Sequence, residues 1–166
     1  MKLSKIVIAA AVVAASASSV TSAIAQAKEQ FFPLLSYRTG PYAPNGTPWA
    51  NGKQDYLKMI NARDGGINGV KITFEECETN YTTDRGVESY ERLKTRPGVT
   101  LFDPQATGIT FALTEKAPVD KIPLMTLGYG LSVAADGMAF KWNFPYMGSY
   151  WTGADILIQH IGKNAG

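Results

Sequence analysis

Strand-type and helix-type segments alternate along most of the chain, and few folds accommodate that order. Strands are expected at residues 31–37, 70–75, 99–102, 121–127 and 139–143, and helices at about 48–64, 83–96, 109–117 and 150–161. Alternation of this kind favours right-handed crossovers between parallel strands. We therefore expect an α/β fold, in which a parallel sheet is flanked by helices on both faces.

Turn residues indicate where these elements end. The glycine-rich run Asp64–Gly69 is expected to terminate the first helix, because glycine readily adopts the left-handed conformation beyond a helix C-terminus. Thr83 or Asp84 is expected to cap the second helix, and Pro97-Gly98 to end it.

Residues 1–25 have the pattern of a secretory signal peptide. Lys2 and Lys5 precede an uncharged, mostly apolar stretch, Ile6–Ala17, and Ala23-Ile24-Ala25 is a small-x-small cleavage pattern. Cleavage after Ala27 is the second choice. A membrane anchor is disfavoured, because a span needs roughly 20 strongly apolar residues. The expected organisation is a signal peptide at 1–25 and an exported domain at 26–166, located in the periplasm.

The charge balance argues against a nucleic-acid partner. The signal peptide contains two of the 16 Lys and Arg residues and no acid, so 14 basic residues remain against 14 Asp and Glu. The exported domain therefore has no net charge and no basic cluster that would follow a phosphate backbone.

The sequence offers little for catalysis or metal binding. With one Cys and one His, it has neither an internal disulfide nor a four-ligand zinc module. Cys77 is expected to be a small buried thiol and His160 to lie at the surface of a late helix. Gly128-x-Gly130 lacks the third glycine of a dinucleotide fingerprint. We therefore expect no catalytic residues, no metal and no cofactor.

Three loops are candidates for a binding site. Ligands of open parallel sheets bind beyond the carboxyl ends of the strands, and the loops 38–48, 103–108 and 128–137 follow strands. Thr107-Gly108-x-Thr110 stands at a helix start, where free N–H groups and two hydroxyls favour a carboxylate. The alternative is that Thr107 only caps the helix.

Acidic and aromatic residues are further candidates for a functional site. Strand alternation places Glu75 and Glu76 on opposite faces, which favours a solvated strand end over a metal or acid–base site for Glu75-Glu76-x-Glu78. Most of the later aromatic residues are expected in the core or at a contact between lobes, with one or two walling an apolar ligand pocket: Trp49, Tyr129, Trp142, Tyr146, Tyr150 and Trp151.

Several runs resemble one family. They are Asn61-Ala62-x-x-Gly65-Gly66-Ile67-x-Gly69, the loop Thr107–Ala112, and Lys121-Ile122-Pro123-Leu124. Over residues 30–162 the sequence resembles the N-terminal lobe of the type I periplasmic substrate-binding proteins of ABC transporters. The resemblance is greatest to the leucine/isoleucine/valine-binding branch, which includes binders of urea and short-chain amides.

The resemblance implies a fold and a function. Family members have two α/β lobes around a cleft, are not enzymes, and deliver a small solute to permease subunits in the inner membrane. By this comparison the chain is a truncated fragment that holds the first lobe without the second.

The resemblance also implies ligand-binding residues. Thr107, Gly108 and Thr110 are expected to hold a carboxylate or amide. A second set of contacts is expected from Tyr129, Gly130, Leu131 and Ser132, while Asn45 and Trp49 overlook the cleft. Amino-acid binders use an acid to hold the ligand ammonium, and Asn143–Tyr146 has none. The expected solute is a branched-chain amino acid or a small amide or urea-like molecule.

Two other classes remain open at this point: an exported α/β enzyme, and the ligand-sensing domain of a receptor. The first is disfavoured because nucleophile–base and phosphate-loop motifs are missing from the sequence. The second requires a downstream membrane span.

Overall fold

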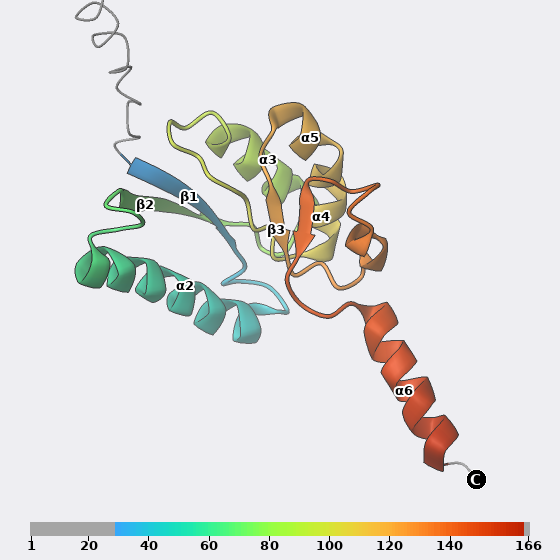
Figure 1. The fold of residues 1–166 in the computed structure, drawn as a ribbon. Helices are drawn as coiled ribbons and strands as arrows, with labels where there is room; N and C mark the ends of the chain where they lie inside the picture. Colours follow the sequence, from blue (N-terminus) through green and yellow to red (C-terminus); the bar gives the residue numbers. More distant parts are fainter. Residues whose placement is uncertain (1–28, 165–166) are drawn as a thin grey trace, which may run out of the picture.

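The computed structural model describes residues 29–164, so the expected signal peptide lies outside the described part. Strands and helices alternate along it, as the sequence predicts (Figure 1). The elements are β1 (Glu29–Ser36), α2 (Ala43–Asp64), β2 (Lys71–Glu78), α3 (Thr83–Leu93), α4 (Thr107–Thr114), α5 (Lys116–Asp120), β3 (Leu124–Thr126), the 3-10 turn η1 (Ser132–Ala135), β4 (Asn143–Pro145) and α6 (Tyr150–Asn164).

The strands pair in parallel. β1 runs beside β2 with Phe31 opposite Thr73, and β3 runs beside β4. The expected strand at 99–102 is wrong, because this segment makes only isolated bridges with β1 and β3. The Thr100 amide donates to the Phe31 carbonyl at 3.1 Å, and the Met125 amide donates to the Phe102 carbonyl at 2.8 Å. The segment therefore divides its bonds between two neighbours and joins the two strand pairs.

Helices lie on both faces of the strands. Figure 1 shows α2 on one side and α3 and α4 on the other. The main core lies on the α3–α4 side, where Phe31 and Leu35 of β1 are buried against the helices. Its other members are Cys77, Tyr90, Leu93, Phe102, Ala106, Ile109, Leu113, Ala117, Ile122 and Leu124. On the opposite side α2 buries only Gly46 and Ala50.

The first helix begins earlier than expected. α2 starts at Ala43, because Pro44 fits in a first turn where no backbone N–H is required. Its end matches the expectation, since Gly65 is left-handed with φ 71° and donates to the Asn61 carbonyl. The Asn61 side chain bonds to both backbone groups of Ile72. Its Nδ2 donates to the Ile72 carbonyl at 2.7 Å, and its Oδ1 accepts the Ile72 amide at 2.9 Å. This residue of the family-like run fastens α2 to β2.

Other boundaries also differ. Thr82, rather than Thr83 or Asp84, is the N-cap residue of α3, and no side chain caps that helix. The expected helix 109–117 is divided into α4 and α5. The expected strand 121–127 is reduced to the three-residue β3, and the expected strand 139–143 is displaced to β4, with which it shares only Asn143.

The last helix stands apart from the core. α6 extends away from the other elements in Figure 1, and none of its residues is buried. Its exposed apolar side chains include Trp151, Leu157, Ile158 and Ile161. Among the described helices, none combines the length and hydropathy required to span a membrane.

Candidate functional site

A cavity of about 350 Å³ opens where β1, β2 and β3 end. This is the edge of a parallel sheet at which ligands bind in open α/β folds. The loops after the strands and the N-terminal ends of α2, α4 and α6 supply its lining: Tyr37, Tyr42, Asn45, Trp49, Tyr81, Gln105, Thr107, Leu127, Tyr129 and Tyr150. None of these ten side chains carries a formal charge.

Three tyrosines form the wall contributed by the first two strands. The Tyr37 and Tyr81 rings meet edge to face with centroids 5.0 Å apart, and Tyr42 lies 4.4 Å from Tyr81. We call Tyr37, Tyr42 and Tyr81 the first wall. Burial, assisted by neighbouring phenols, raises the pKa of Tyr37 and of Tyr81, so both hydroxyls are neutral at physiological pH.

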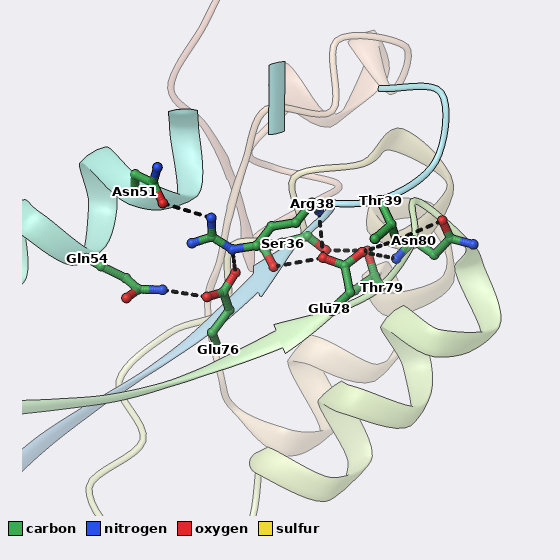
Figure 2. A network of polar contacts seen from close by, with 9 residues as sticks. All are labelled: Ser36, Arg38, Thr39, Asn51, Gln54, Glu76, Glu78, Thr79 and Asn80. Atoms are coloured by element: carbon green, nitrogen blue, oxygen red, sulfur yellow. Dashed lines mark hydrogen bonds and ion pairs between the residues drawn. The ribbon is translucent and has the colours of Figure 1, made fainter. Parts of the chain in front are cut away.

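The carboxylate of Glu78 holds the loops that carry the first wall (Figure 2). It accepts the backbone N–H of Arg38 at 2.6 Å, the hydroxyl of Thr39 at 3.0 Å and the backbone N–H of Asn80 at 2.7 Å. The backbone N–H and the hydroxyl of Thr79 both donate to the Ser36 carbonyl, each at 2.8 Å. The end of β1 is thereby joined to the end of β2.

These bonds also hold a strained turn. Asn80 and Tyr81 both have left-handed backbones, with φ 50° and 57°. This conformation costs a residue other than glycine roughly 1–2 kcal/mol. Burial tends to raise the pKa of Glu78, but hydrogen bonds from Arg38, Asn80 and Thr39 outweigh it and lower the pKa. An ionised Glu78 therefore holds the turn that presents Tyr81 to the cavity.

A second wall comes from the loop after β3 and the start of α6. Tyr129 and Tyr150 lie 5.8 Å apart between ring centroids, and the Tyr150 amide donates to the Tyr129 carbonyl at 3.2 Å. The Ser132 hydroxyl donates to the same carbonyl at 3.0 Å. A Cβ on Gly130 would lie 2.9 Å from Thr107 Cγ2. Ser132 and Gly130 therefore position the second wall, Tyr129 and Tyr150.

Gln105 joins the cavity to a buried ion pair. With its amide oriented to satisfy its neighbours, Oε1 accepts Trp49 Nε1 at 2.8 Å and Lys53 Nζ at 2.7 Å. Lys53 also pairs with Asp103, which accepts the Tyr146 hydroxyl at 3.1 Å. Trp49 is thus held in place by a polar network that leads away from the cavity.

The residues of the Thr107 loop have different surroundings. Ala106 is the N-cap residue of α4, so the expectation that Thr107 caps the helix is wrong. Thr107 lines the cavity, and Gly108 is exposed beside Thr83. Thr110 is fully buried, and its hydroxyl bonds the Ala106 carbonyl and Thr126.

The acidic residues of β2 and Cys77 make contacts that stabilise the fold. Glu75 pairs with Arg92 and Arg96, whereas Glu76 pairs with Arg38, which confirms that the two carboxylates face opposite sides. Cys77 is a buried free thiol, as expected. Within residues 29–164, no group of three or more His, Cys, Asp and Glu side chains is placed to hold a metal ion.

A second cavity of about 440 Å³ lies between α2 and the sheet. Apolar side chains such as Phe32, Leu57 and Met125 line most of it. Its charged residues, Lys53 and Asp103, are paired with each other. This cavity is beneath a helix rather than at the strand ends, so we take the tyrosine-lined cavity as the candidate site.

Comparison with known proteins identifies the family. Residues 29–166 match the model of the periplasmic binding protein family. The chain belongs to this family of substrate-binding proteins, whose members are not enzymes. Membership of this family therefore excludes the alternative of an exported α/β enzyme. No curated protein matches the chain.

Solved structures share the fold of this chain. An ABC transporter permease from the Pseudomonas fluorescens group is 45% identical, with a TM-score of 0.74 over 82% of this chain and 34% of that one. A branched-chain amino acid ABC transporter from Thermus thermophilus with bound valine is 22% identical, with a TM-score of 0.72 over 82% and 36%. A fatty acid ABC transporter substrate-binding protein from Thermomonospora curvata is 19% identical, with a TM-score of 0.70 over 83% and 34%. The chain spans about a third of the length of these structures.

Sequence reasoning identified part of the cavity lining. Asn45, Trp49, Thr107 and Tyr129 are brought together there, whereas the other expected contacts are not: Gly108, Thr110, Gly130 and Ser132. The sequence analysis missed Tyr37, Tyr42, Tyr81 and Gln105. A tyrosine at the end of the first expected strand, and another in the loop after the second, were the available indications.

Proposed function

We propose that this chain supplies one side of the solute site of a substrate-binding protein that serves an ABC importer. The observation that carries the proposal is the neutral cavity at the ends of the parallel strands, where residues from the loops and from the starts of α2, α4 and α6 converge. Asn45, Trp49, Thr107 and Tyr129 are its proposed contact residues. Gly130 and Ser132 position the loop that carries Tyr129.

The solute is a small organic molecule that is handed to permease subunits in the inner membrane. The relatives bind different solutes by their descriptions, valine in one case and a fatty acid in another. Small amides and urea-like molecules fit the uncharged lining better than a free amino acid does. Burying an ammonium group without a carboxylate partner is costly.

The proposal is tested by measuring solute binding directly. NMR titration of the labelled chain suits the weak affinity that we expect from one side of a cleft. Leucine, valine, urea and short amides are the first ligands. Shifts confined to the amides of residues 37–49, 79–82, 105–108 and 127–130 support the site, while shifts confined to the cavity beneath α2 contradict it. Thr107→Val, which keeps the shape and removes the hydroxyl, should weaken binding.

Export is the second part of the proposal. We expect removal of residues 1–25, with cleavage after Ala25. N-terminal sequencing of material recovered from the periplasm checks this point. A chain that still begins at Met1 would contradict it.

A further inference from the structure

The candidate cavity is dominated by aromatic rings. Five of its ten lining side chains are tyrosines and one is a tryptophan, with no charged side chain among them. A site for a branched aliphatic side chain needs aliphatic walls, and here Leu127 is the single aliphatic residue in the lining.

The rings are arranged as two separate walls. Ring contacts join Tyr81 to Tyr37 and Tyr42 in the first wall, and Tyr129 to Tyr150 in the second. Within residues 29–164, no ring contact joins one wall to the other. Ring faces and edges therefore remain available across the cavity.

Polar groups in the lining are also available. Within the described part of the chain, seven polar side-chain groups of the lining make no hydrogen bond. They are the hydroxyls of the five tyrosines, the hydroxyl of Thr107 and the amide of Asn45. These groups are all neutral and most both donate and accept, so they suit a neutral or anionic polar group.

We infer that the cavity takes a small solute with an aromatic ring that bears a carboxylate or carboxamide group. Aromatic rings attract one another in tilted or offset geometries at centroid distances of about 4.5–7 Å, and the tyrosine pairs already show this spacing. A cavity of about 150 Å³ is enough for benzene, and this one measures about 350 Å³. The inference rests on the proposed function and names its substrate class.

The test compares an aromatic ring with a saturated ring of the same size. The full chain is titrated with benzoate, benzamide and cyclohexanecarboxylate, and with leucine and choline for reference. Ring–ring contact adds about 0.5–1.5 kcal/mol beyond burial, which is about two- to tenfold in affinity for each wall that contributes. We expect benzoate to bind more tightly than cyclohexanecarboxylate by that factor.

Substitutions of single tyrosines test which wall is responsible for the preference for an aromatic ring. Tyr129→Leu should reduce the preference for the aromatic ring by the share of the second wall, whereas Tyr129→Phe, which retains the ring, should preserve it. Tyr129 is partly exposed in a loop, so this position tolerates change. The matched control is Tyr56→Leu, because Tyr56 is an exposed tyrosine of α2 that does not line this cavity. Tyr81→Leu tests the first wall in the same way.

The outcomes separate this inference from the proposed function. Equal affinity for benzoate and cyclohexanecarboxylate overturns the inference, as does tighter binding of leucine or choline; in each case solute binding itself is retained. A chain that binds none of these solutes contradicts the proposed function as well. A preference that is unchanged in both Tyr129→Leu and Tyr81→Leu places the aromatic solute elsewhere and also overturns the inference.

Discussion

The hydroxyls of Thr110 and Thr126 lie 2.8 Å apart in the interior, where they join α4 to β3. Thr110 donates its single proton to the Ala106 carbonyl at 3.0 Å, so Thr126 donates to Thr110. Thr126 in turn accepts the Gly128 amide at 2.8 Å. This chain of bonds sets the start of the loop that carries Tyr129.

Thr110→Val should therefore reduce stability rather than solute affinity. The substitution keeps the side-chain shape but leaves the buried Thr126 hydroxyl without its acceptor, which costs about 1–3 kcal/mol. Urea unfolding measures the loss, and Thr95→Val is the exposed control. Unchanged stability combined with weaker solute binding would restore the ligand role that the sequence suggested for Thr110.

Two glycines of α2 should respond in opposite directions to alanine. A Cβ on Gly46 would lie 2.1 Å from the Tyr37 carbonyl oxygen, so Gly46→Ala should displace the helix start and cost about 1–3 kcal/mol. Gly52 has open space around it, and Gly52→Ala should stabilise the protein by about 0.5–1 kcal/mol. Thermal unfolding compares the two variants, and an unchanged stability of Gly46→Ala would contradict the packing of α2 against Tyr37.

Lys53 should matter more than the exposed lysine one turn further along α2. The side chain of Asp103 is 8% exposed and that of Lys53 is 24% exposed. Lys53→Met leaves a mostly buried carboxylate without its cation, and we expect a loss of about 2–3 kcal/mol. Lys58→Met removes an exposed pair with Asp55 and should cost less than about 1 kcal/mol. Equal losses in denaturant unfolding would contradict this difference.

The pH dependence of stability should report on Glu78. Its pKa in the folded protein is below the ordinary value of 4.5, so the carboxylate adds stability above about pH 4.5. That contribution is lost as the pH falls through the folded pKa. Glu78→Gln should lower stability at pH 7 and flatten the decline between about pH 5 and pH 3. Glu88→Gln, on the exposed face of α3, is the control, and an unchanged acid slope in Glu78→Gln would contradict the role of the carboxylate.

Local patterns predicted the architecture but not the boundaries. The alternation of element types was enough for the parallel sheet and its two helical layers. The segment 99–102 has a strand pattern, but whether it forms a ladder depends on how β1 and β3 are placed beside it. The start of α2 was missed because three prolines in 38–48 suggested a loop, whereas Pro44 fits a first helical turn.

The sequence by itself determined the type and order of the elements, the left-handed end of α2 at Gly65, and the family. These features depend on residues that are near one another along the chain. Only the tertiary structure decided which side chains share the cavity. Tyr37 and Tyr150 are more than a hundred residues apart and line the same cavity because parallel strands end at one edge of the sheet. The tertiary structure likewise buried Thr110 against Thr126, since whether a hydroxyl faces a ligand or the interior depends on what packs over it.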